Sequence, residues 1–285
     1  MALPQRIVRR IEALESLDRM ARPLAAQAKR ATRATPVKNA LSGTWLGHPL
    51  HPMLTDLPIG AWVTAALLDV TGGSAGARDA RRLVGAGVLA ALPTAAAGWS
   101  DWSDTYGADQ RVGLVHAVGN VTAVALQIGS YLGRRRGHRA LGVALSSAAL
   151  GAVTLTGYLG GHLSYVRGIG VNRTAFEEPV TDWVDVAPLE DLAPEGQPAR
   201  VAAKGIPVML VRHGEDVLAL SATCVHAGGP LDEGKMLDGS VQCPWHGSVF
   251  RLSDGKVLRG PASVTQPVWQ ARIEGGRVQV RSATR

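Results

Sequence analysis

The stretch from Cys224 to His246 constrains this chain more than any other part of its sequence. It holds both cysteines of the 285 residues, in CVH at 224–226 and CPWH at 243–246. An iron–sulfur centre with mixed ligation uses two Cys on one iron and two His on the other. Zinc also binds two Cys and two His, but zinc fingers usually pair Cys with Cys and His with His. One Cys and one His at each turn therefore favour two irons with different ligands.

The residues around these motifs resemble the two cluster-binding loops of a Rieske [2Fe–2S] domain. The loops are Cys224-Val225-His226-Ala227-Gly228-Gly229-Pro230-Leu231 and Cys243-Pro244-Trp245-His246-Gly247-Ser248-Val249-Phe250. The resemblance covers about residues 180–282 and implies that Cys224 and Cys243 hold the inner iron. It implies that His226 and His246 hold the outer iron. Gly260-Pro261-Ala262 resembles the proline loop that shields the cluster in this family.

Two departures from the quinol-oxidising Rieske proteins indicate the ferredoxin branch of the family. Those proteins carry an extra Cys in each loop, joined as a disulfide, where this chain has Gly229 and Trp245. Their Tyr donor to a cysteine sulfur is replaced by Phe250, whereas Ser248 is retained as a candidate donor. With fewer hydrogen bonds to sulfur, we expect a potential toward the low end of the Rieske range of about −150 to +300 mV.

Four apolar segments in the first part of the chain are candidate membrane helices. They are Pro52–Val70, Leu83–Ser100, Val112–Gly133 and Ala140–Val166. About twenty apolar residues span a bilayer as a helix, so the last three qualify directly. The first is interrupted by Asp56 and, on hydropathy alone, fits a re-entrant segment as well. A soluble bundle would need charged faces on the third and fourth segments, which have none.

This part also resembles a family of uncharacterised four-helix membrane domains. The matching motifs are HPLHP at 48–52, LPIG at 57–60 and GGHLSY at 160–165, within a match of about residues 44–171. We therefore predict a multidomain chain, with a four-helix transmembrane bundle followed by an all-β Rieske-type small barrel or sandwich. Its parts are a basic amphipathic N-terminal segment at 1–40, the transmembrane domain at 41–166, a linker at 167–181 and the Rieske-type domain at 182–285.

Two further regions have a clear period. Residues 4–33 place apolar side chains at helical spacing opposite a face of arginines, which predicts a helix on an anionic membrane surface or a solvated helix. After the linker, short apolar runs between Gly and Asp turns predict strands. They are expected at 183–186, 207–212, 217–219, 241–242, 257–259, 268–273 and 278–280.

Four spans bring histidines together at one membrane face, because alternate helices run in opposite directions. The helix ends on this face carry His48, His51, His116 and His162, four of the eight histidines. We expect His116 and His162 to be the axial ligands of a haem b, with His51 as a substitute ligand or propionate partner. A quinone pocket, or histidines that bond only to backbone and headgroups, are the alternatives. The chain leaves the fourth helix here, so we expect this site beside the cluster.

The leading hypothesis is a membrane-tethered Rieske protein that transfers single electrons to or from a partner protein. The expected partner is a reductase, or else a terminal acceptor such as an oxygenase. A quinol- or haem-linked membrane oxidoreductase and a redox sensor with a structural cluster are the alternatives. A Rieske oxygenase needs a second iron on two His and a carboxylate, and no histidine follows His246. We expect an electron-transfer component rather than a self-contained enzyme, and assign no catalytic residue.

Charge decides the expected location of the chain. The net charge of +7 does not indicate nucleic-acid binding, since the arginines lie mainly at the ends of apolar runs and in the N-terminal segment. Nine Lys and Arg before residue 39 favour a cytoplasmic N-terminus, whereas arginines in the loops at 78–82 and 134–139 favour the opposite orientation. We expect a multi-pass protein of the inner (plasma) membrane with a cytoplasmic Rieske-type domain, because export of the basic N-terminus would need a signal sequence.

Overall fold

The computed structural model describes residues 3–193 and 196–283. The chain forms two compact units, each built from two stretches of sequence. The helical unit contains the chain up to Ala34 and Leu50–Ile169, and the β-rich unit contains Thr35–Pro49 and the chain from Gly170 onward. The first two residues of the expected N-terminal segment and the last two of the expected Rieske-type domain lie outside the described residues.

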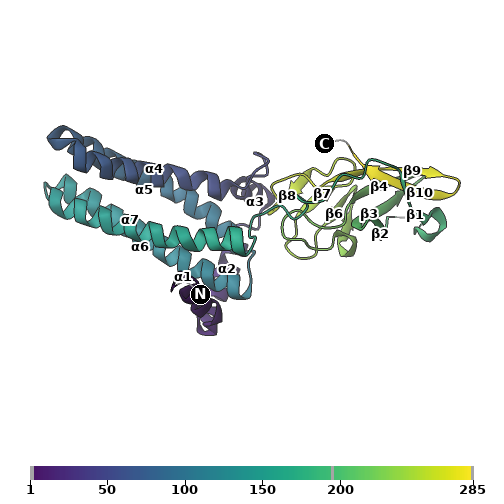
Figure 1. Ribbon diagram of the computed structural model, residues 1–285, viewed down its shortest axis with the longest axis horizontal. Coiled ribbons are helices and arrows are strands. Elements are labelled where there is room, and N and C mark those ends of the chain that lie inside the picture. The colour runs from purple at the N-terminus through teal and green to yellow at the C-terminus, as the bar shows by residue number, and fades with distance from the viewer. Residues whose placement is uncertain (1–2, 194–195, 284–285) are drawn as a thin grey trace. The chain divides into compact units, whose positions relative to one another are not determined.

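Four long helices form most of the helical unit (Figure 1). They are α4 (Leu50–Thr71), α5 (Gly73–Trp102), α6 (Gly107–Arg135) and α7 (Arg139–Gly161), and a π-helical turn, His162–Val166, follows α7. Each helix, with this turn added to α7, is long and apolar enough to cross a membrane. The expected four-helix membrane fold is confirmed. Since α4 is one continuous helix of 22 residues with Pro58 inside it, it is not the broken segment that re-entry requires.

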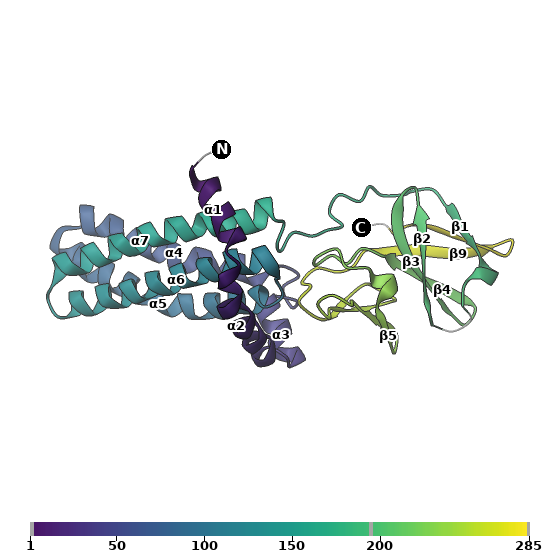
Figure 2. The same cartoon turned by 90° about the horizontal axis from the view of Figure 1, so that it is seen from below.

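The four helices are arranged as two hairpins. α4 packs along α5, α6 packs along α7, and both hairpin turns lie at the same end of the bundle (Figures 1 and 2). Small residues allow the helices to approach closely. A methyl group on Gly87 of α5 would come within 2.3 Å of Nε1 of Trp62, so only glycine leaves room for this indole of α4. Ala65 of α4 packs with Ala80 and Val84 of α5 in one buried cluster.

The N-terminal segment forms two helices rather than the single helix expected over 4–33. α1 (Leu3–Ala13) and α2 (Asp18–Ala31) are separated by a 3₁₀ turn, Glu15–Leu17. At the break, Arg111 of α6 donates from Nη1 to Glu12 O at 2.6 Å and from Nε to Asp18 Oδ1 at 2.7 Å. A guanidinium of the bundle thus satisfies a carbonyl at the end of α1, which allows the helix to stop there. Val8 of α1 is buried against the bundle.

The described part of the β-rich unit contains ten strands in two antiparallel sheets. The strands are β1 (Val184–Pro188), β2 (Pro198–Ala203), β3 (Ile206–His213), β4 (Asp216–Ser221), β5 (Lys235–Leu237), β6 (Ser240–Gln242), β7 (Val249–Arg251), β8 (Val257–Arg259), β9 (Val268–Glu274) and β10 (Arg277–Ser282). One sheet has the order β1-β10-β9-β4-β3-β2 and the other β5-β6-β7-β8. The seven expected strands are confirmed, and β2, β5 and β7 were not predicted. β2 begins with Pro198, which an edge strand tolerates but which weakens the strand pattern in the sequence.

Two stretches outside the strands pack with the β-rich unit. α3 (Thr35–Ser42), which precedes the first membrane helix, lies against the chain that follows β8. In the segment expected to be a linker, the N–H of Arg173 donates to Val225 O at 3.0 Å and Val180 is 3% exposed. The β-rich unit therefore contains a stretch of the chain that precedes the membrane helices and a stretch that follows them.

Candidate metal centre

Two loops with the same backbone hydrogen bonds carry the four expected cluster ligands. One begins at Cys224 after β4, and the other begins at Cys243 between β6 and β7. Each cysteine N–H donates to the carbonyl oxygen five residues on, and the N–H four residues on donates back to the cysteine carbonyl, at 2.8–3.1 Å. The residues in that fourth position, Gly228 and Gly247, have φ of 82° and 75°. Glycine adopts this left-handed conformation without a steric penalty, so both turns can take the same shape.

The loops bring the four side chains together, with sulfur inside and imidazole outside. Cys224 and Cys243 are 1% and 2% exposed, and their thiols are hydrogen-bonded to each other. His226 and His246 are partly exposed, with ring centroids 5.0 Å apart and ring planes at 80°. A cluster with two Cys on an inner iron and two His on an outer iron needs this order of burial.

The surroundings of the two sulfurs favour negative charge on Cys243 and oppose it on Cys224. The hydrogen bond from the Cys224 thiol, together with the N–H groups of Trp245 and His246, lowers the pKa of Cys243 to about 6. The same contact with Cys243, and burial, raise the pKa of Cys224. The N–H groups of His226 and Ala227 also point at the sulfur of Cys224. Backbone N–H groups thus approach sulfur in both loops, and such groups tune the potential of iron–sulfur clusters.

Two local features fit a [2Fe–2S] cluster held by these residues. The buried Nδ1 atom of His226 makes no hydrogen bond within the described part of the chain, although other atoms of this residue take part in interactions. A ring nitrogen in this position is suited to bind iron. A methyl group on Gly229 would come within 2.8 Å of Cys243 Sγ, so glycine keeps the space beside the sulfur open. The larger Cys of the quinol-oxidising proteins would occupy that space.

Gln266 holds the first loop, although no motif in the sequence singles it out. Its fully buried side chain accepts from the N–H of Val225 at 3.0 Å and donates to Ser221 O at 2.8 Å and Thr223 O at 2.7 Å. One amide thus fixes the chain on both sides of Cys224. A single Gln between short strands carries no pattern that would distinguish it from a surface residue.

The second loop is held by the segment that resembles the proline loop. The N–H of Ala262 donates to Ser248 Oγ at 3.0 Å. Nη1 of Arg259 donates to the carbonyl oxygens of Gly247 and Gly260, both at 3.0 Å. The position of this segment is therefore tied to the turn that carries His246. Ser248 accepts from Ala262, which leaves its own hydroxyl proton for another acceptor.

The bundle histidines have different partners from those expected. Nδ1 of His116 lies 2.8 Å from Thr156 O, and Nδ1 of His51 lies 2.9 Å from Thr94 O. Nε2 of His162 lies 3.2 Å from Glu12 Oε1 of α1. His162 thus binds the N-terminal segment, whereas His116 binds the neighbouring helix. These contacts do not favour His116 and His162 as ligands of one group.

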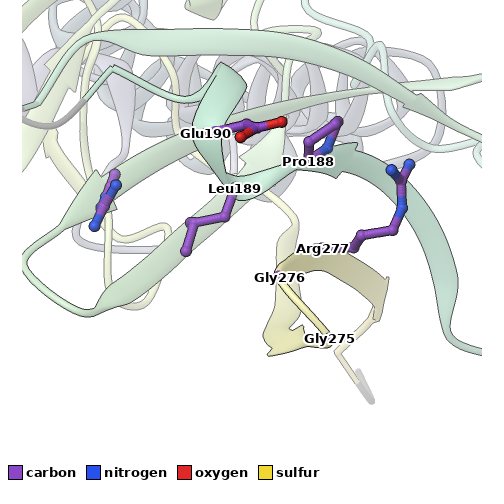
Figure 3. Close-up of a pocket in the computed structure, with 7 residues that line it drawn as sticks. Pro188, Leu189, Glu190, Gly275, Gly276 and Arg277 are labelled. Carbon is purple, nitrogen blue, oxygen red and sulfur yellow. The ribbon is translucent and has the colours of Figure 1, made fainter.

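A surface pocket of the β-rich unit contains none of these residues (Figure 3). It lies between the end of β1 and the turn that joins β9 to β10, and Arg212 of β3 also lines it. Pro188, Leu189, Glu190, Gly275, Gly276 and Arg277 make up the rest of its wall. It therefore has no part in the candidate centre.

Comparisons with known proteins agree with this geometry. Residues 182–270 match the family model of the Rieske [2Fe-2S] domain, and residues 47–173 match the model of a predicted membrane protein (DUF2231). Ferredoxin CarAc of Metapseudomonas resinovorans is 30% identical over 99 residues, which are 34% of this chain and 92% of that protein. The cytochrome b6-f complex iron-sulfur subunit of Chlorobaculum tepidum is 33% identical over 76 residues, 27% of this chain and 41% of that protein.

A third relative shares only this domain. Apoptosis-inducing factor 3 of Homo sapiens is 37% identical over 76 residues, 27% of this chain, but this chain spans only 13% of its length. What all three relatives have in common with the chain is the iron–sulfur domain, and the expected [2Fe–2S] cofactor is confirmed. The chain belongs to the Rieske [2Fe–2S] family, and in it the Rieske domain follows a membrane domain of the predicted membrane protein (DUF2231) family.

Proposed function

We propose that the chain is a membrane-anchored electron carrier in which Cys224 and Cys243 hold the inner iron of the cluster and His226 and His246 hold the outer iron. When bound, the cluster supplies a one-electron couple. The burial order carries the proposal, because the thiols are 1% and 2% exposed while both imidazoles are partly exposed. Electrons therefore enter and leave through the histidine edge.

The surface beside that edge suits a protein partner. Trp245 is 53% exposed, and its ring centroid lies 6.3 Å from that of His246. Exposed tryptophans are frequent anchors of protein interfaces. The similarity to ferredoxins supports two kinds of partner, a reductase or a terminal acceptor such as an oxygenase. Four candidate spans and a basic N-terminus support a multi-pass protein of the inner (plasma) membrane, with the Rieske domain in the cytoplasm.

A second candidate function gives the bundle a redox group, haem b or quinone, held by two of the three histidines expected from the sequence, His51, His116 and His162. One observation favours it. His51 and His116 each place Nδ1 against a backbone carbonyl, at 2.9 and 2.8 Å. A hydrogen bond from the second ring nitrogen is the usual support of a metal-binding histidine.

The test is the metal content and reactivity of the full chain, purified in detergent. We expect about two irons and two acid-labile sulfides per chain, and a reduced-state EPR spectrum of a mixed-ligand cluster. Zinc without sulfide would overturn the proposal. Reduced protein should pass electrons to a Rieske-dependent oxygenase, and Trp245→Ala should slow this transfer but leave the cluster spectrum unchanged. A cluster that exchanges electrons with no partner protein would favour the sensor alternative.

A further inference from the structure

The two hairpins of the bundle repeat one another at equivalent positions. His51 of α4 contacts Thr94 O of α5, and His116 of α6 contacts Thr156 O of α7, at 2.9 and 2.8 Å. The second histidine comes 65 positions after the first, and the second threonine comes 62 positions after the first. Two helix pairs therefore make the same side-chain to carbonyl contact at matching places.

The same two offsets, 65 positions from α4 to α6 and 62 positions from α5 to α7, recur three helical turns further along. Nε1 of Trp62 donates to Val84 O at 3.3 Å, and Oγ of Ser146 donates to Gln127 Oε1 at 3.0 Å. Gln127 follows Trp62 by 65 positions, and Ser146 follows Val84 by 62. Two separate cross-helix contacts thus share one register, as expected if the α6–α7 hairpin is a second copy of the α4–α5 hairpin.

An ion pair marks the axis between the copies. Asp69 of α4 and Arg134 of α6 are also 65 positions apart, and their side chains are only 4% and 3% exposed. Nη1 and Nη2 of Arg134 donate to the two carboxylate oxygens at 2.7 and 2.5 Å. Equivalent residues of two copies touch only where the copies meet, so α4 and α6 face each other across a two-fold axis that runs along the bundle.

The two histidines lie on the faces that this ion pair defines. Each precedes its charged residue by 18 positions, His51 before Asp69 and His116 before Arg134. Eighteen residues are five turns of about 3.6 residues, so each pair shares one side of its helix, about 27 Å apart. His51 and His116 therefore face each other across the axis, at the end of the bundle away from the hairpin turns.

Each ring is oriented in the same way and rests on a glycine. A carbonyl can only accept, so Nδ1 of both rings carries the proton and Nε2 keeps a lone pair. The amide of Asn120, which approaches Nε2 of His116 at 3.0 Å, agrees with that tautomer. A methyl group on Gly98 would come within 2.6 Å of His51 Cε1, and one on Gly160 within 3.1 Å of His116 Cε1. These two glycines are again 62 positions apart.

We propose that this symmetric pair would hold one b-type haem through Nε2 of His51 and Nε2 of His116, with Asn120 moved away from His116. The bundle offers no third His, Cys, Asp or Glu for a bare metal ion within the described residues. A porphyrin supplies four nitrogens to its iron, so two imidazoles complete the coordination. His162 has no equivalent in the other copy, since Ser100 stands 62 positions before it. The inference rests on the proposed electron-transfer function and names the cofactor of its membrane part.

Hemin titration of the full-length protein in detergent tests this. We expect saturation at one hemin per chain with the low-spin spectrum of bis-imidazole iron. His51→Ala and His116→Ala should each weaken binding about tenfold or more and lose that spectrum, which added imidazole should restore. His162→Ala and His138→Ala, the matched controls, should bind as the unchanged chain does.

Other outcomes overturn the assignment. Equal hemin binding by all four variants would mean that hemin enters the micelle or another site. Loss in His162→Ala with retention in His51→Ala would return the site to the pair first expected from the sequence. Quinone in lipid extracts that is lost from both His51→Ala and His116→Ala, without hemin binding, would make the pair a quinone site. The EPR spectrum of the [2Fe–2S] cluster should stay unchanged throughout, so a failure here is distinct from a failure of the proposed carrier function.

Discussion

Asn39 Oδ1 accepts a hydrogen bond from the N–H of Gly260 at 2.9 Å, and Nδ2 of the same side chain donates to Leu258 O at 3.1 Å. Asn39 belongs to α3, the last helix before the first membrane span, whereas Gly260 begins the segment that resembles the proline loop. Arg259 connects this segment to the turn that carries His246. A residue next to the membrane domain in sequence thus supports the surroundings of the cluster.

Asn39→Ala should destabilise the β-rich unit by about 1–3 kcal/mol, because it removes two partly buried hydrogen bonds, one from the N–H of Gly260 and one to Leu258 O. Denaturant unfolding followed through the cluster absorbance measures this effect. Asn39→Asp is the matched control. It keeps the acceptor for the N–H of Gly260 but cannot donate to Leu258 O, so its effect should be intermediate. Wild-type unfolding of Asn39→Ala would show that the α3 contact contributes nothing to the unit.

His246→Ala should abolish or change the cluster and leave membrane insertion intact, since the ligand belongs to the β-rich unit and the spans to the helical unit. Iron and sulfide analysis of purified protein measures the loss, and extraction from membranes measures insertion. His213→Ala, an exposed histidine of β3, should keep full iron and sulfide content. A normal spectrum in His246→Ala would remove this residue from the ligand set.

The midpoint potential of the cluster should lie nearer to about −150 mV than to about +300 mV. Phe250 is fully buried in the core that contains both cysteines, so no tyrosine hydroxyl donates to sulfur there. Redox titration followed by EPR gives the value, and Phe250→Tyr should raise it. A midpoint above about +200 mV would contradict the ferredoxin assignment and favour quinol oxidation.

The convergence of the four candidate cluster ligands could be predicted because each Cys lies two or three positions before its His, and a short turn sets their geometry. The residues that hold the two loops in place could not be predicted in this way. Gln266, Arg259 and Asn39 reach the loops from other parts of the chain, and only the folded structure brings them together. Short strands such as β5 and β7, with three residues each, are too brief to show a period of two.

The bundle shows a different limit. Counting helix ends placed His51 and His116 toward the same end of the bundle, and each of them contacts a carbonyl of the other helix in its own hairpin. It could not give the direction of each side chain. His162 begins a π-helical turn, which changes the rotation per residue, and its ring turns to Glu12 of α1 instead. The choice of His162 as the partner of His116 depended on that rotation.

Acid should loosen the N-terminal helices from the bundle through Asp18. The hydrogen bond from Arg111 lowers the pKa of Asp18 below its ordinary value of 3.8. A carboxylate with a depressed pKa stabilises the folded state above its unfolded pKa, and that contribution is lost as pH falls through the folded value. The protection factor of the α1 amides, which is the intrinsic exchange rate at a given pH divided by their observed rate, should therefore be constant from neutral pH to about pH 4 and fall below it. Asp18→Asn should exchange rapidly at every pH, whereas the exposed Glu15→Gln should behave like the unchanged chain.

Exchange of the two charges at the bundle axis tests the internal two-fold most directly. Arg134→Ala should lower the stability of the bundle by about 3–5 kcal/mol, because the buried carboxylate of Asp69 loses its bidentate partner and keeps only Arg139, 3.9 Å away. If the two positions are equivalent, Asp69→Arg combined with Arg134→Asp should recover most of this loss. Recovery should be incomplete, since Nε of Arg134 also donates to Ser130 Oγ at 3.1 Å and the equivalent residue in the first copy is Ala65.

Thermal unfolding in detergent, followed by circular dichroism, compares the three proteins. A double variant no more stable than Arg134→Ala would mean that α4 and α6 are not related by an axis, and the symmetric placement of His51 and His116 would lose its main support.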